Sequence, residues 1–203
     1  MNGAQRQTAR PPWLGAPLAR GRLGCKAGLG EFGRKRREAA EIRSRYPAGM
    51  TYRITGLDPA PFAPLFHLDD AALAERNIVR MTADSTPGFP CRVTLDDAEP
   101  GETLLLLNHV SHDGDNPYRA THAIFVSGAG QAASYADAIP PALDRRTLSI
   151  RAFDAKGMMT DAALAAPGEA DAVIRRLLAD AAVDHLDAHN AVRGCFAARV
   201  DRA

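Results

Sequence analysis

The chain has 203 residues, 46% of them apolar and 24% charged, with 25 Lys+Arg, 24 Asp+Glu and three cysteines. This length suits one domain with its own hydrophobic core, and no apolar run approaches the roughly 18 residues that a membrane-spanning helix needs. Three cysteines are too few for a disulfide scaffold, so we expect a reducing, cytoplasmic setting.

The first 49 residues differ in charge from the rest. They hold eleven Lys+Arg against three Asp+Glu, a net +8, whereas residues 50–203 carry −7. They have no apolar periodicity and too little apolar surface to offset the entropy of ordering. Three interpretations stay open: a translated upstream region with true initiation at Met50, which we favour; a disordered basic arm for nucleic acid or an acidic partner; or a cleaved targeting peptide. The run Gly28–Gly33 matches G-x-G-x-x-G, but no strand precedes it, so it predicts no dinucleotide site.

Residues 50–203 alternate short strands with few helices. Tyr52–Leu57 is typical of a strand, and Asp69 predicts the N-cap of a short helix over Asp70–Arg76 that Asn77 closes. Further strands are expected at Ile78–Ala83, Cys91–Leu95, Glu102–Val110, His122–Ser127 and Thr147–Phe153, with a polar loop at Ser111–Asn116.

One main helix is predicted after Pro167-Gly168-Glu169, with an apolar stripe formed by Val173, Ile174, Leu177 and Leu178. Two short strands follow it. Strands and helices that do not alternate strictly favour an α+β fold, with a mostly antiparallel or mixed sheet packed against this helix and short helical turns. We expect a single domain over residues 50–203.

The last two strands predict a hairpin with one polar face. Along Val183–His189, the side chains of His185, Asp187 and His189 fall on one face. A five-residue turn pairs Ala188 with Phe196, which keeps the apolar faces together. This register puts His189 opposite Cys195 and His185 opposite Arg199.

Such a face allows specific chemistry, because cross-strand neighbours lie about 5 Å apart and a Cys–His pair at that distance can share a proton. We therefore take His189 and Cys195 as candidate catalytic residues. The alternatives are a solvated polar face without a site, and a metal site. Histidines and aspartates at 109–115 resemble a metal-binding loop by composition only, so we assign no metal ligands and no cofactor.

Candidate ligand-binding residues are those able to bind an anion near the hairpin. Arginine binds carboxylates and phosphates in bidentate fashion, and the set comprises Arg92, Tyr118, Arg119, Arg199 and Asn190. Surface ion pairs are the alternative role for the arginines. Together with His189 and Cys195 these residues predict a site for a small anionic molecule, with or without catalysis. The second hypothesis is a non-catalytic module that binds a protein partner through its polar sheet face or a strand edge. At −7, residues 50–203 would repel nucleic acid.

Several dispersed motifs resemble one bacterial family. The chain carries, in order, Phe89-Pro90-Cys91-Arg92, Asp97-Ala98-Glu99-Pro100-Gly101-Glu102, Pro117-Tyr118-Arg119, Ile124-Phe125-Val126, Arg151-Ala152-Phe153-Asp154, His189-Asn190-Ala191 and Ala198-Arg199-Val200-Asp201-Arg202. They are similar to the uncharacterised family called domain of unknown function 1203, over residues 50–203. The resemblance implies a compact bacterial domain and no known activity. Two positions depart from the family pattern: Asp187 where a histidine is typical, and His122-Ala123 where Gly-Pro is typical.

Overall fold

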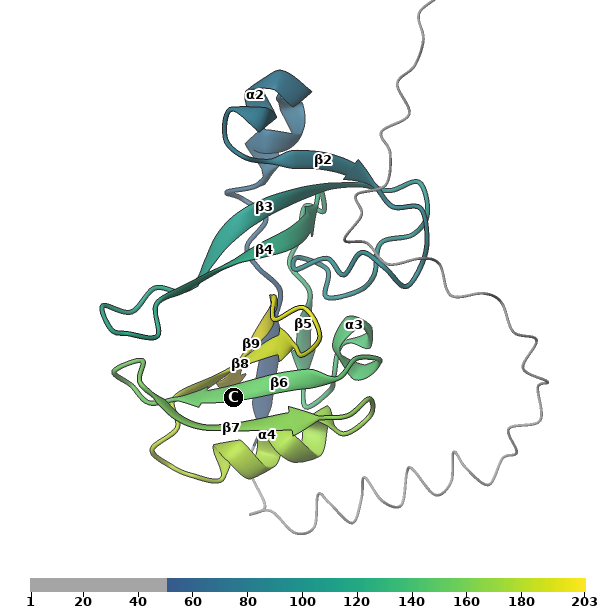
Figure 1. Cartoon of the computed structure of the whole chain (residues 1–203). Coiled ribbons are helices and arrows are strands. Elements are labelled where there is room, and N and C mark those ends of the chain that lie inside the picture. Colours follow the sequence, from purple (N-terminus) through teal and green to yellow (C-terminus); the bar gives the residue numbers. More distant parts are fainter. Residues whose placement is uncertain (1–50) are drawn as a thin grey trace, which may run out of the picture.

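The computed structural model of the chain describes residues 51–203, which form two antiparallel sheets. The larger sheet has the strand order β5-β1-β9-β8-β6-β7, and the smaller has the order β2-β3-β4 (Figure 1). The strands are β1 (Tyr52–Thr55), β2 (Val79–Thr82), β3 (Thr103–His112), β4 (Ala120–Ser127), β5 (Ser134–Ala136), β6 (Leu148–Phe153), β7 (Met159–Ala165), β8 (His185–Asn190) and β9 (Phe196–Arg202). The helices are the 3-10 helix η1 (Ala63–His67), α2 (Asp70–Ala74), α3 (Pro141–Asp144) and α4 (Ala170–Leu178). The predicted α+β class is confirmed.

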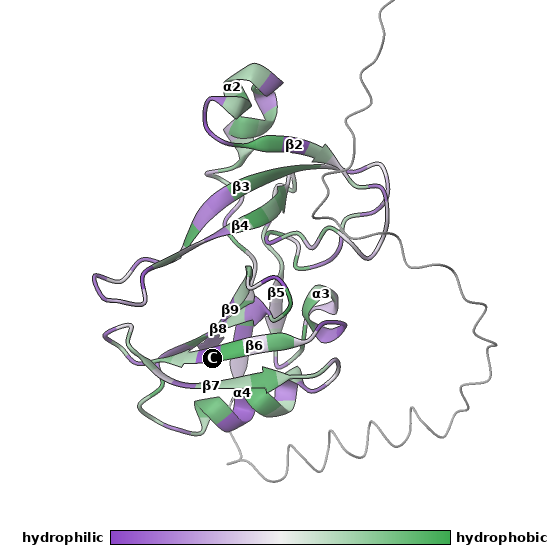
Figure 2. Cartoon of the chain, in the orientation of Figure 1, coloured by the Kyte–Doolittle hydropathy of each residue, from purple (hydrophilic) through white to green (hydrophobic). Residues whose placement is uncertain are grey.

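The main helix covers one face of the six-stranded sheet. Ile174, Leu177 and Leu178 of α4 are buried against Leu186 and other apolar residues of β6, β8 and β9. Figure 2 shows hydrophobic and hydrophilic residues together on α4, as expected of a helix with one face on a sheet. This core forms because the apolar residues of each strand alternate toward the helix.

The opposite face of the six-stranded sheet points toward the three-stranded sheet. Contacts between the two sheets join Asp187 to His112, His189 to His122, and Arg199 to the backbone of Ser111. The side chains of His185, Asp187 and His189 therefore share one face of β8, as predicted. The face is buried instead of solvated, because β3 and β4 cover it: Asp187 is 1% exposed and His189 2%.

The hairpin register differs from the prediction. β8 and β9 pair Leu186 with Val200, Asp187 with Arg199 and Ala188 with Ala198, and a bulge then pairs His189 with Phe196. The predicted pairs of His189 with Cys195, His185 with Arg199 and Ala188 with Phe196 are therefore wrong. The sequence-based choice assumed a continuous ladder, whereas one extra residue at a bulge keeps Leu186 and Ala188 opposite Val200 and Ala198 and closes a shorter turn. Phe196, expected on the face of Ala198, instead belongs to the core cluster of the three-stranded sheet.

Of the other local predictions, those for the ends of α2 are confirmed, and those for the 91–95 segment and the end of β3 are wrong. Asp69 caps α2 by accepting from the backbone N–H of Ala72 at 2.8 Å, and Asn77 ends it with a positive φ of 57°, as expected. Cys91–Leu95 is a turn instead of a strand, with Leu95 N–H donating to the Cys91 carbonyl. β3 runs on to His112, two residues into the predicted loop, because a bulge after Val110 lets pairing with β4 continue. The short β5 and β7 were not predicted.

No helix within residues 51–203 is long and apolar enough to cross a membrane. The basic segment 1–49, Met50 and the Gly28–Gly33 motif lie outside the described residues.

Candidate functional site

A cavity of about 540 Å³ lies where the β8–β9 turn meets the loop before β3. The loops supply most of its polar lining, and β4 with its neighbour β3 supplies an apolar wall. Polar groups lining it come from Arg92, Arg146, Thr147, Asn190, Arg193 and Cys195, and the remainder from Gly88, Pro90, Leu106, Ala123, Phe125 and Val192. A mostly apolar concavity with a few polar groups is the usual form of a small-molecule site.

Arg92 is the buried cation of this cavity, at 2% exposure. Its backbone N–H donates to the Phe125 carbonyl at 2.9 Å, which ties the 91–95 turn to β4. In its side chain, Nε donates to the Phe196 carbonyl at 2.8 Å, one terminal nitrogen donates to the Pro90 carbonyl, and the other lies 3.1 Å from Cys195 Sγ. Within residues 51–203 no carboxylate pairs with this guanidinium. Burial lowers its pKa, and the nearby Cys195 sulfur opposes that shift.

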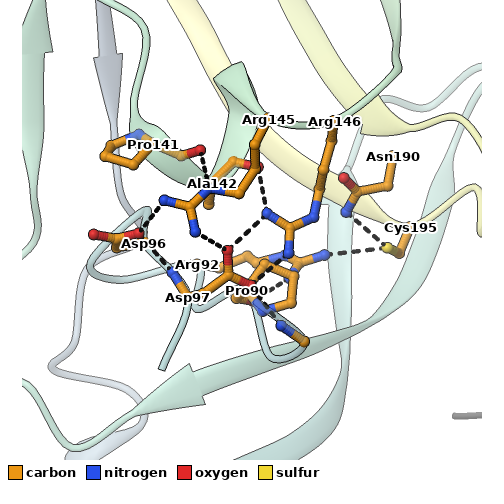
Figure 3. Close-up of polar contacts among 11 residues, drawn as sticks. Pro90, Arg92, Asp96, Asp97, Pro141, Ala142, Arg145, Arg146, Asn190 and Cys195 are labelled. Atoms are coloured by element: carbon orange, nitrogen blue, oxygen red, sulfur yellow. Dashed lines mark hydrogen bonds and ion pairs between the residues drawn. The ribbon is translucent and has the colours of Figure 1, made fainter. Parts of the chain in front are cut away.

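Cys195 sits at the end of the turn that joins β8 to β9. Its sulfur accepts from the Arg92 guanidinium and from the Asn190 side-chain amide, whose nitrogen lies 3.3 Å away (Figure 3). The turn itself is closed by two backbone bonds, from Asn190 N–H to the Cys195 carbonyl and from Gly194 N–H to the Asn190 carbonyl. Gly194 has a φ of +70°, which the turn requires and glycine adopts readily. Arg92, Asn190 and Cys195 thus form one hydrogen-bonded group.

Arg146 brings a second guanidinium to the cavity, held by a buried carboxylate. Both oxygens of Asp97 accept from Arg146, and one also accepts from Arg145 at 3.2 Å (Figure 3). The Asp97 side chain is 1% exposed and also accepts from the Gly88 N–H at 3.2 Å. This ion pair therefore fixes the loop that carries Arg92 against the end of α3.

His189 is buried beside the cavity and does not line it. Its Nδ1–H donates to the Gly194 carbonyl at 3.3 Å, and its ring meets His122 edge-on at 4.9 Å between centroids. Burial, with the positive charge of Arg151 and the neighbouring His122, lowers its pKa to about 4. The ring is therefore neutral near pH 7. Among the hydrogen bonds of the described residues, none joins it to Cys195.

The other candidate residues lie elsewhere. Arg199 donates from Nε to Asp187 at 3.1 Å and from a terminal nitrogen to the Ser111 carbonyl at 3.4 Å. Arg119 is exposed and pairs with Asp113 at 2.8 Å. Tyr118 is 37% exposed and packs edge-on against a neighbouring ring, Phe153. The structure thus brings together three of the seven candidates, Arg92, Asn190 and Cys195.

Sequence reasoning missed Arg146, Thr147 and Arg193 as cavity residues. The adjacent pair Arg145-Arg146 after Pro140-Pro141 was the only signal, and a charged dipeptide of this kind is usually a solvated surface feature. Arg146 becomes informative only when the fold places Asp97 beside it.

A family model described as "Protein of unknown function (DUF1203)" matches residues 88–202, which is more than half of the chain, and the chain belongs to this family. No curated protein and no solved structure matches it. The matched region contains all the polar residues that line the cavity.

Proposed function

We propose that this member of the DUF1203 family binds a small anionic molecule in the cavity between the 88–92 loop and the β8–β9 turn. The observation that carries the proposal is the Arg92 guanidinium, which is buried in the cavity wall without a carboxylate partner among the described residues. A buried charge is costly unless a counter-charge and hydrogen bonds compensate it.

The donors of Arg92 support an anion as that counter-charge. A guanidinium has five N–H groups on three nitrogens. In Arg92 each nitrogen donates one hydrogen bond, to the Phe196 carbonyl, the Pro90 carbonyl or the Cys195 sulfur. The remaining N–H groups can donate to a carboxylate or phosphate. Arg146 and Arg193 add positive charge to the same lining, and the Asn190 amide adds a further donor. The apolar side chains of Leu106, Phe125 and Val192 favour a ligand that also has an apolar part.

The thiol gives a second candidate function at the same place. Cys195 lines the cavity and accepts hydrogen bonds from Arg92 and Asn190, which is the environment in which a cysteine acts as a nucleophile. A bound anion next to that sulfur is a candidate substrate. His189 is a weaker candidate for the base, because it donates to Gly194 and lies outside the cavity lining.

The alternative function, a module that binds a protein partner, is expected to use either the polar sheet face or a strand edge. The polar side chains of β8 on this face, His185, Asp187 and His189, are buried, so a partner cannot dock on them. A strand edge remains as the surface for that alternative, and the cytoplasmic location stays an expectation.

Binding is tested by isothermal titration calorimetry of the full chain with inorganic phosphate, succinate and phenylacetate. We expect saturable binding of at least one anion, at least tenfold weaker in Arg92→Met and in Asn190→Asp, which places a negative charge in the cavity. Arg119→Met is the matched control, because it removes an exposed arginine that is not part of the cavity lining. Equal affinities for wild type, Arg92→Met and Asn190→Asp would refute the site.

The thiol is tested separately by alkylation of Cys91→Ser and Cys91→Ser/Arg92→Met protein with iodoacetate and iodoacetamide, followed by peptide mass spectrometry of Cys195. We expect the ratio of the Cys195 alkylation rate with iodoacetate to the rate with iodoacetamide to be higher in the protein that retains Arg92 than in the Arg92→Met protein. The same rate ratio in both backgrounds contradicts a role for Arg92 at the sulfur.

A further inference from the structure

A second polar cluster lies at the opposite end of β8. His112 from β3 and His185 and Asp187 from β8 are all buried, at 5%, 8% and 1% exposure. One side-chain nitrogen or oxygen of each lies within 4.8 Å of the corresponding atoms of the other two. Along β8, His185 lies five positions from the cavity residue Asn190, about 16 Å, and Asp187 lies three positions from it, about 10 Å.

Each of the two imidazoles presents one nitrogen without a partner among residues 51–203. These two atoms, His112 Nδ1 and His185 Nε2, are buried and accept or donate no hydrogen bond within that part of the chain. The other nitrogen of each ring is bonded: His112 Nε2–H donates to the Gly157 carbonyl at 3.0 Å, and His185 Nδ1–H donates to the Asp184 carboxylate at 2.9 Å. These outer bonds place the proton on the far side of each ring and leave a lone pair on the unpartnered nitrogen.

Asp187 completes a set of three donors. Its Oδ1 accepts from Arg199 Nε at 3.1 Å, and its Oδ2 lies 3.7 Å from His112 Nδ1. That separation is too long for a hydrogen bond. It is close to the spacing of about 3.4 Å between two ligand atoms that each lie about 2.1 Å from a tetrahedral metal ion.

The surrounding residues hold both rings in place. The Phe153 ring stacks on His112 at 4.4 Å and on His185 at 5.4 Å between centroids. Gly157 allows its carbonyl to approach His112, because a Cβ there would lie 3.0 Å from Nε2. Metal-binding histidines typically have this second bond to a carbonyl or carboxylate, which orients the ring and sets its tautomer.

We propose that His112, His185 and Asp187 bind one divalent transition-metal ion through His112 Nδ1, His185 Nε2 and Asp187 Oδ2. Two imidazoles and a carboxylate suit zinc, iron or cobalt, and hard cations such as Mg²⁺ prefer all-oxygen sites. Three protein ligands leave at least one coordination position open, which is the arrangement of a catalytic centre and not of a closed structural site. Asp184 contacts His185 and Arg199 contacts Asp187, and their side chains are 57% and 41% exposed, so the cluster lies one side chain away from solvent on this side.

The test is titration of EDTA-treated, metal-free full chain with Zn²⁺ by calorimetry and with Co²⁺ by visible absorption. We expect one equivalent of either ion whose affinity falls at least tenfold in His185→Gln and in Asp187→Asn, with loss of the Co²⁺ ligand-field bands. Asp184→Asn keeps all three ligands and changes a partly exposed residue, so it should fold normally and weaken binding about 10- to 100-fold. His67→Gln, at an exposed position in η1, is the control and should bind as wild type.

Circular dichroism and thermal melts establish that each variant is folded before it is titrated. Binding of an ion elsewhere, for instance within residues 1–50, would be equal in wild type, Asp187→Asn and Asp184→Asn. That result, or the absence of saturable binding by wild type, overturns the proposal. A failure here leaves anion binding at Arg92 untouched, because the two experiments share neither residues nor probes.

Discussion

Replacing Gly157 with alanine tests the packing that holds His112. Gly157 has a φ of +73°, and a Cβ on it would lie 2.9 Å from Asn116 Nδ2 and 3.0 Å from His112 Nε2. Gly168 is the matched control: its φ is +83°, and a Cβ there would meet nothing within 4 Å. The two substitutions therefore share a backbone cost and differ in side-chain crowding.

The expected magnitudes follow from that difference. A non-glycine residue in the left-handed region costs roughly 1–2 kcal/mol, which applies to both variants. In Gly157→Ala the Asn116 amide can move toward solvent, but the His112 ring is buried and stacked on Phe153. Displacing it weakens its bond to the Gly157 carbonyl, at about 1 kcal/mol for a hydrogen bond of this kind. We expect Gly168→Ala to lose about 1–2 kcal/mol of unfolding free energy and Gly157→Ala about 1 kcal/mol more.

Urea unfolding followed by circular dichroism measures both free energies, and a similar slope for all three proteins is required for the comparison. The Zn²⁺ titration of the same samples provides a second readout: Gly157→Ala should bind more weakly and Gly168→Ala as wild type. Equal destabilisation by the two substitutions, with equal Zn²⁺ affinity, would refute the reasoning that Gly157 is needed to position His112.

Two further predictions concern His189, which lies between the two sheets, and Asp97, which pairs with the cavity residue Arg146. Burial lowers the pKa of His189 to about 4, so as the pH falls this histidine is protonated in the unfolded state before it is protonated in the folded state. Its contribution to the free energy of unfolding is therefore fully present above about pH 6.5 and falls by about 3 kcal/mol as the pH drops to 4. Urea unfolding at pH 7, 6 and 5 should give a smaller loss in His189→Asn than in wild type; identical slopes contradict this. Asp97→Asn breaks a buried ion pair with Arg145 and Arg146 and should cost about 3 kcal/mol. Asp113→Asn, whose partner is exposed, should cost less than about 1 kcal/mol in the same assay, and similar losses would contradict the argument.

The fold class and the two faces of β8 could be predicted because both depend on local periodicity. Alternation alone assigns Leu186 and Ala188 to the core and Asp187 and His189 to the other face, and the structure agrees. The register could not be predicted in the same way. A bulge near His189 changes the pairing by one residue, and no residue type near that position signals a bulge in advance.

The cavity and the metal-binding cluster depend on contacts distant in sequence. Arg92 and Cys195 are 103 residues apart, and their hydrogen bond follows only from the docking of the 91–95 turn on β4. His112 is a loop residue by composition and a buried strand residue in the fold, opposite Asp187 on the other sheet. Periodicity contains no information about which sheet covers which, so this juxtaposition lies beyond single-sequence reasoning.

A β-bulge lies near each of the two proposed sites. The polar layer, meaning the buried polar side chains between the two sheets, such as His112, Asp187 and His189, therefore has features that packing alone does not require. The register shifts between Val110 and His112 in β3, between Ala152 and Phe153 in β6, and between Ala188 and His189 in β8. A bulge re-aims the adjacent side chain and interrupts the ladder. Within residues 51–203, one nitrogen of His112 and one of His185 are buried without a hydrogen-bond partner, which costs free energy that apolar side chains at these positions would not. A bound ion at one end of β8 and a bound anion at the other would each supply the missing partner, and both titrations therefore examine the same property of this layer.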